Sequence, residues 1–148
     1  MNRRTLLTTI AALVLLPAAL QAEPKTYVIE MITEGGRKYF EPKYLEVAAG
    51  DTVRFVNVSG RHNTESIRGM IPDGVTPWRS ALKETFDLTL TQEGVYGYKC
   101  SPHLSNGMIG LIVVGDPSSN LEAAKSVSLG RRNDAIFEEL FTLVPNPS

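Results

Sequence analysis

Two short β-type segments joined by one loop place the strongest constraint on how this chain can fold. Residues 95–100 (VYGYKC) and 108–116 (MIGLIVVGD) are rich in β-branched and aromatic residues, and the SPHLSNG stretch between them is typical of a turn. Segments so close in sequence form a hairpin, which needs further strands around it for stability. The loop follows Cys100, the only cysteine of the chain, carries His103 and ends at Met108.

Further strands are expected throughout the preceding part of the chain. They are predicted at residues 26–32 (TYVIEMI), within FEPKYLEVAAGD, at residues 52–59 (TVRFVNVS) and in the alternating stretch 84–94. The TEGGR stretch between the first two is typical of a turn. Short strands at this spacing predict an all-β fold, an antiparallel sandwich or barrel.

The C-terminal part changes from strand-type to helix-type patterns. Ser119 and Glu122 have the spacing of a capping box, Gly130 is a helix stop, and Asn133 is a second N-cap candidate. A helical extension over about residues 119–144 is therefore predicted. Its second half has an apolar stripe that should pack on the outside of the barrel, made of Ile136, Phe137, Leu140, Phe141 and Val144.

The N-terminal segment 1–22 reads as a secretory signal peptide. Arg3 and Arg4 precede an apolar run that ends in small residues at Ala22, where cleavage is expected. General secretion and twin-arginine export both remain open. Residues 23–148 are then expected to form one soluble domain, because no later apolar run is long enough to span a membrane.

Charge and cysteine content limit the function of the exported chain. Without Arg3 and Arg4 it has 13 basic and 16 acidic residues, a net charge of −3, which does not suit a nucleic-acid binder. Cysteines of exported proteins usually occur in disulfide pairs. A solitary cysteine must instead be buried and inert, paired with another molecule, or bound to a metal.

The metal-bound alternative is supported by the neighbouring residue types. The chain has two histidines, His103 in the loop and His62 directly after the predicted strand 52–59. A thiolate, two imidazoles and a weak thioether from Met108 form a set that suits copper cycling between Cu(I) and Cu(II). Zinc would fit less well, since structural zinc sites use more thiolates. The chain lacks the C-x-x-C-H motif that attaches a c-type haem. The residues around Cys100 also do not resemble the signatures of Cys/His hydrolases.

These segments resemble the cupredoxin family and, within it, closely resemble the pseudoazurin group. The similar stretches are FEPKYLEVAAGDTVRFVNV, HNTESIRGMIPDG, GVYGYKCSPH, GMIGLIVVGDP and NLEAAK, in the same order. The resemblance covers essentially the whole chain after the signal peptide. It implies a Greek-key β-sandwich of about eight strands with two C-terminal helices. It also implies one type 1 copper held by His62, Cys100, His103 and Met108.

The resemblance further implies roles for neighbouring residues. Asn63 matches the position that ties the two ligand loops together and gives a backbone N–H to the cysteine sulfur, and Pro102 stiffens the loop. Ser101 stands where the family commonly has threonine. LSNG after His103 and the PNPS end also depart from the family pattern, and the loop change bears on which partner docks there.

The function implied is one-electron transfer in the periplasm, with no enzymatic activity. The resemblance implies partners such as copper nitrite reductase, nitrous oxide reductase or cytochromes c, which a monomer would meet in transient complexes. His103 would be the exit for the electron, inside an apolar patch of Pro102 and Leu104. Arg61, Arg79 and Lys99 are candidates for a positive rim. The alternative is a periplasmic copper chaperone or storage module, which would need exchangeable ligands.

Overall fold

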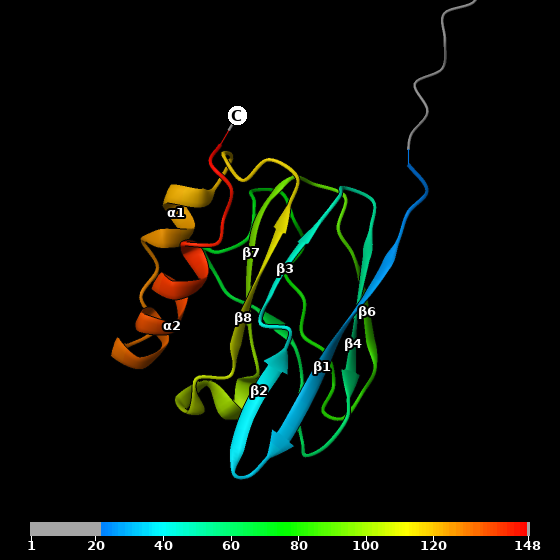
Figure 1. Cartoon of the computed structure of the whole chain (residues 1–148), viewed down its shortest axis with the longest axis vertical. Coiled ribbons are helices and arrows are strands. Elements are labelled where there is room, and N and C mark those ends of the chain that lie inside the picture. Colours follow the sequence, from blue (N-terminus) through cyan, green and yellow to red (C-terminus); the bar gives the residue numbers. More distant parts are fainter. Residues whose placement is uncertain (1–21, 148) are drawn as a thin grey trace, which may run out of the picture.

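The predicted hairpin lies at the centre of one of two β-sheets that pack face to face (Figure 1). The structure, a computed structural model, describes residues 22–147. One sheet has the order β2-β1-β4-β6 and the other β3-β8-β7-β5. The strands are β1 (Thr26–Glu34), β2 (Arg37–Glu41), β3 (Tyr44–Val47), β4 (Thr52–Asn57), β5 (Glu65–Ser66), β6 (Phe86–Thr89), β7 (Gly94–Lys99) and β8 (Ile109–Val114).

The predicted sandwich of about eight strands is confirmed, but two strand pairs differ from the antiparallel expectation. β1 pairs with β4, and β3 with β8, in parallel. The stretch FEPKYLEV is also divided into two strands that lie in different sheets. Pro42, between β2 and β3, has no backbone N–H to donate to a ladder, so the chain leaves the first sheet there.

The core between the sheets is aromatic around its centre. Tyr98 of β7 contacts Phe40 and Phe55 edge-to-face, with ring centroids 4.8 and 5.2 Å apart. All three side chains are fully buried, and Cys100 and Met108 belong to the same apolar cluster. The end of the core therefore carries the sulfur atoms of the predicted site.

Helices α1 (Leu121–Lys125) and α2 (Arg131–Phe141) follow the strands, as predicted, but they begin differently. Asn120, not Ser119, is the N-cap of α1, and its side-chain amide bonds to the backbone N–H and C=O of Val95. Asn133 lies inside the first turn of α2, where its amide donates to the carbonyl of Leu129. Both predicted caps are wrong, because the Ser119 hydroxyl donates to the carbonyl of Glu93 and the Asn133 amide to that of Leu129.

The apolar stripe of α2 packs as predicted, against the outer face of the β3-β8-β7-β5 sheet. Phe137 and Leu140 are buried there with Val95, Ile109 and Leu111 of the sheet. Ile136, Phe141 and Val144 pack around the same cluster. The helix pair thus covers the face of the hairpin that points away from the other sheet (Figure 1).

The predicted signal peptide falls on residues 1–22 and so, apart from Ala22, lies outside the described residues. Within residues 22–147, neither helix has the length and apolar character that a membrane crossing requires.

Candidate metal centre

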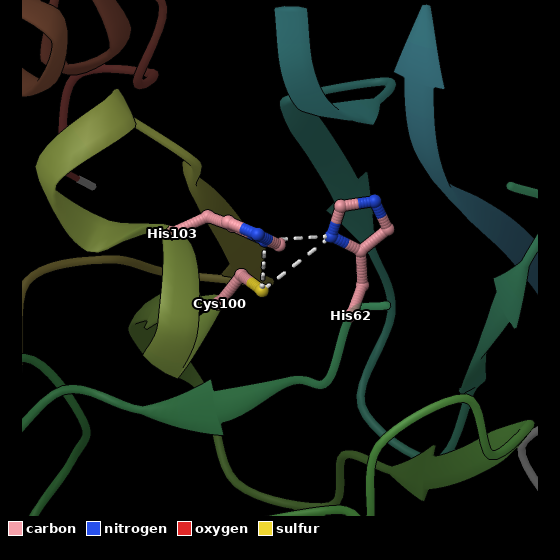
Figure 2. A group of neighbouring side chains, drawn as sticks. All are labelled: His62, Cys100 and His103. Atoms are coloured by element: carbon pink, nitrogen blue, oxygen red, sulfur yellow. Dashed lines mark hydrogen bonds between the residues drawn. The ribbon is translucent and has the colours of Figure 1, made fainter. Parts of the chain in front are cut away.

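The side chain of His62 meets those of Cys100 and His103, about 40 positions further along the chain (Figure 2). The sulfur of Cys100 lies 3.4 Å from Nδ1 of His103 and 3.7 Å from Nδ1 of His62. The two Nδ1 atoms are 3.0 Å apart. His62 and Cys100 are buried, while His103 is partly exposed. The structure thus brings together three of the four predicted ligands.

Cys100 and His103 are placed by the end of β7 and by the turn that follows it. Cys100 directly follows β7 and is the N-cap of the 3₁₀ segment η1 (Ser101–Asn106), which has Pro102 in its first turn. A proline fits this position because the first N–H groups of a helix have no internal partner. His103 lies at a kink inside η1, with φ −122°. The turn therefore brings the imidazole back beside the sulfur.

The His62 ring is oriented by Thr33 at the end of β1. Its Nε2 lies 2.9 Å from the hydroxyl of Thr33. With a metal bound at Nδ1, the proton of the ring is on Nε2, and this N–H donates to the hydroxyl oxygen, an arrangement typical of metal-binding histidines. Gly60 permits this approach, because a Cβ there would lie 2.8 Å from Nε2 and its φ is +84°. Sequence reasoning missed Thr33, which no local motif distinguishes.

The electrostatic environment favours neutral imidazoles, whereas the buried thiol has a raised pKa and would need the charge of a bound metal to become a thiolate. Burial raises the pKa of the Cys100 thiol, while backbone hydrogen bonds from Asn63 and His103 lower it. The pKa of His62 is lowered by burial, and also by His103 and Lys38. That of His103 is lowered by burial and then by Lys38. Both imidazoles thus favour the unprotonated form that binds metals.

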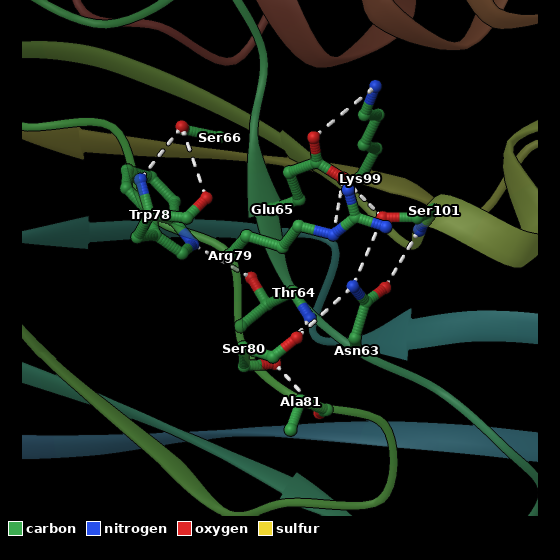
Figure 3. A network of polar contacts seen from close by, with 10 residues as sticks. All are labelled: Asn63, Thr64, Glu65, Ser66, Trp78, Arg79, Ser80, Ala81, Lys99 and Ser101. Atoms are coloured by element: carbon green, nitrogen blue, oxygen red, sulfur yellow. Dashed lines mark hydrogen bonds and ion pairs between the residues drawn. The ribbon is translucent and has the colours of Figure 1, made fainter.

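Asn63 ties the two ligand loops together (Figure 3). Its side-chain oxygen accepts the backbone N–H of Ser101 at 2.8 Å, and its amide donates to the Ser101 hydroxyl at 3.1 Å. The Ser101 hydroxyl in turn donates to the carboxylate of Glu65. This carboxylate lies 3.8 Å from Arg79 and 4.0 Å from Lys99. The predicted role of Asn63 is confirmed, whereas Glu65 was missed.

Met108 closes the loop on the core side. The backbone N–H of Cys100 donates to the Met108 carbonyl at 2.9 Å, and the Met108 N–H donates to the His103 carbonyl at 3.3 Å. Gly107, in the left-handed region with φ 77°, makes the turn into Met108. The Met108 side chain is fully buried in the cluster that contains Cys100.

The three donor atoms have the spacing that one metal ion needs. Bonds of about 2.0 Å to nitrogen and 2.3 Å to sulfur in a trigonal plane separate the donors by about 3.5–3.8 Å. The observed separations of 3.0, 3.4 and 3.7 Å come close to this triangle. The donor set of one sulfur and two nitrogens suits copper. The residues present therefore fit a single ion.

Comparison with known proteins places these features in a family. A family model described as copper binding proteins, plastocyanin/azurin family, matches residues 27–115. The pseudoazurin of Paracoccus pantotrophus is 38% identical over 82% of this chain and 86% of its own length. The pseudoazurin structure from Methylobacterium extorquens AM1 is 36% identical, with a TM-score of 0.75, over 79% of this chain and 97% of that one. The pseudoazurin structure from Hyphomicrobium denitrificans is 31% identical, with a TM-score of 0.75, over 82% of this chain and 99% of that one.

Proposed function

The chain belongs to the plastocyanin/azurin family of copper-binding proteins, and from this premise we propose that it is a one-electron carrier of the pseudoazurin type. The observation that supports this most directly is the convergence of two Nδ1 atoms and one sulfur within 3.0–3.7 Å. Copper supplies the Cu(II)/Cu(I) couple at such a site. The chain itself is proposed to have no catalytic activity.

We assign His62, Cys100, His103 and Met108 as the ligands. Thr33 orients the His62 ring by a hydrogen bond, and Asn63 accepts the backbone N–H of Ser101, the residue after Cys100. The closed turn of η1 fixes His103. Because these contacts come from the folded protein, the ligand atoms stay in one arrangement whichever oxidation state is bound. Little rearrangement is then needed when an electron arrives or leaves.

The proposed route for the electron runs through His103. It is partly exposed, whereas His62 and Cys100 are buried, and the neighbouring Pro102 is exposed. A small surface of this kind suits a brief encounter with a redox partner. The proposed partners are a copper nitrite reductase, a nitrous oxide reductase or cytochromes c. The exposed Arg61 is proposed to orient an acidic partner there, together with Arg79, which is exposed but lies 3.8 Å from the Glu65 carboxylate.

The test of the copper site is spectroscopic. Copper-loaded protein should show the intense visible band of a Cu(II)–thiolate, and Cys100→Ser should abolish it. Ser105→Ala, at an exposed position of the same turn, is the matched control and should keep the band. A blue Cys100→Ser variant would disprove the site. Loss of copper during repeated oxidation and reduction would instead favour a chaperone or storage protein.

The assignment of Met108 has its own test. Met108→Leu should retain copper and raise the reduction potential, because a thioether donor to the oxidised state is lost. Met70→Leu is the control, since Met70 is equally buried but lies in the cluster under the helices. Equal potentials for wild type and Met108→Leu would argue against axial ligation.

Export, cleavage and assembly state are also proposals. We propose that the chain is delivered to the periplasm, cleaved after Ala22 and present there as a monomer. Expression of the full chain in a Gram-negative host, followed by fractionation and N-terminal sequencing, tests the first two. Light scattering of the purified product tests the third. A cytoplasmic product that begins at Met1 would contradict the export proposal.

A further inference from the structure

A cavity of about 250 Å³ lies beside the metal-binding turn, and four of its lining residues are cationic. Arg37 and Lys38 come from β2, Lys43 from the β2–β3 connection, and Arg132 from the first turn of α2. We call these four residues the cationic cavity. Asn106 and Gly107, at the end of the turn, close its other side. Three separate elements thus meet around the ligand loop.

The cationic cavity has no counter-charge of its own. No aspartate or glutamate lines it, and none of the four cations forms an ion pair within residues 22–147. The nearby Glu34 accepts the hydroxyl hydrogen bond of Tyr39, at 3.0 Å. Arg37 lies over the Tyr39 ring, 5.3 Å from its centroid, so the four cations share one hollow with an aromatic ring but with no carboxylate. Their mutual repulsion would be relieved by an anion.

The cavity is in direct contact with the loop that carries the ligands. A Cβ at Gly107 would lie 3.2 Å from Nε of Arg132 and 2.8 Å from Cδ1 of Ile136, so α2 rests on the residue before Met108. Lys38 is the register partner of Thr33, whose hydroxyl bonds to His62. An occupant of the cavity would therefore lie next to both ligand-bearing segments.

We propose that the cationic cavity binds a tetrahedral oxyanion, for which inorganic phosphate is the fitting dianion. Arginine guanidinium groups bind such oxygens in pairs, and lysine ammonium groups add point charges. Asn106 lines the cavity at the loop side, and an amide side chain there is a candidate donor. The small volume suits a single compact ion.

Binding at this place would act on the redox centre, a consequence that rests on the proposed copper function. A negative charge between Lys38 and the loop stabilises the more positively charged oxidised state, so the reduction potential falls when the anion binds. By linkage, the oxidised protein binds the anion more tightly than the reduced protein. The cavity would thus adjust the potential to the local anion concentration.

Calorimetry of the copper-loaded protein tests the binding itself. Inorganic phosphate is titrated at a pH where the dianion dominates, with ionic strength held constant by sodium chloride. Arg132→Gln should weaken binding about tenfold or more, because one charge-assisted hydrogen bond is lost. Arg131→Gln is the matched control, since it removes the same charge from the adjacent, exposed residue outside the cavity.

Equal weakening by Arg131→Gln and Arg132→Gln would overturn the proposal, as it would reveal general attraction by surface charge. Equal binding of acetate and phosphate would also overturn it, because the site is assigned to a tetrahedral dianion. In the diamagnetic Cu(I) protein, saturable NMR shifts of the Gly36, Asn106 and Gly107 amides should locate the site. Shifts confined to other residues would contradict it.

Voltammetry tests the coupling. Phosphate should lower the potential of the wild-type protein more than chloride does at equal ionic strength, and Arg132→Gln should lose this difference. A phosphate-independent potential in a protein that binds phosphate would overturn the coupling. The calorimetric experiment needs no redox activity, so it remains decisive even if the proposed electron-transfer function is wrong.

Discussion

The two faces of the β3-β8-β7-β5 sheet differ in what they contribute to the site. Because side chains alternate along a strand, Tyr96, Tyr98 and Cys100 point into the sandwich, while Val95 of β7 points to the helices. In β8 all six residues are buried; Ile112 and Val114 belong to the cluster between the sheets, and Ile109 and Leu111 belong to the cluster under the helices. One face carries the chemistry and the other is covered by α1 and α2.

This difference shows why the hairpin is a rigid support. No helix within residues 22–147 covers the outer face of the β2-β1-β4-β6 sheet, and Val28 of β1 is 49% exposed. The hairpin, in contrast, is buried on both sides, so its backbone has little freedom to move. The helix pair therefore stabilises the hairpin that carries the ligand loop, from the outer face of its sheet, without supplying a ligand.

The largest expected effect comes from removing the cover. Phe137→Ala should destabilise the protein by about 3–5 kcal/mol, because a large side chain buried against the sheet is lost. The visible spectrum of the folded copper protein should stay unchanged, since the inner face is untouched. Chemical denaturation and absorbance measure the two quantities. A changed spectrum in the folded variant would show that packing on the outer face of the sheet affects the copper site on the inner face.

A change on the inner face should disturb both stability and site. A Cβ on Gly110 would overlap the hydroxyl group of Tyr98, its register partner, and lie 2.8 Å from Cε2 of the ring. Gly110→Ala should therefore cost about 1–3 kcal/mol through overpacking and shift the copper spectrum. The double variant with Tyr98→Val should recover most of the loss. Simple additivity in this double-mutant cycle would refute the proposed collision.

The sequence predicts the local part of the site and misses the long-range part. Cys100 and His103 are three positions apart, so one turn suffices to bring them together. His62 could be assigned only from the chemistry of the ligand set and the family resemblance. Thr33 and Glu65 carry no signal, because their partners, His62 and Ser101, lie 29 and 36 positions away and meet them only through the fold.

The errors in the fold have similar physical causes. Strand composition is the same for parallel and antiparallel pairing, so the β1–β4 and β3–β8 pairs could not be recognised. β5 has only two residues and therefore no periodicity. The capping pattern at Ser119 failed because Asn120 bonds to the backbone of β7, a contact that outweighs the local motif.

A smaller effect, opposite in sign, is expected from the phenol of Tyr98. Its hydroxyl is buried and has no hydrogen-bond partner among residues 22–147, and burial strongly raises its pKa. Tyr98→Phe should increase the free energy of unfolding by about 1 kcal/mol, since an unpaired buried hydroxyl is unfavourable. Denaturant titration measures this free energy. Tyr96→Phe is the control: the Tyr96 hydroxyl donates to the Gln92 carbonyl at 2.6 Å, so its removal should destabilise the protein. A less stable Tyr98→Phe would reveal a hydrogen-bond partner, such as a buried water.

The smallest effect is expected on the uncovered face. A valine-to-alanine substitution made once in each sheet compares the two outer faces. Val28→Ala should change the free energy of unfolding by less than about 0.5 kcal/mol, because the side chain is already half exposed. Val95→Ala, at a fully buried position on the covered face, should cost more than about 1.5 kcal/mol for the apolar groups lost. Equal costs would mean that the helices add little to the burial of the hairpin. A large cost at Val28 would instead show that the outer face of β1 is covered in solution by a partner or a second copy.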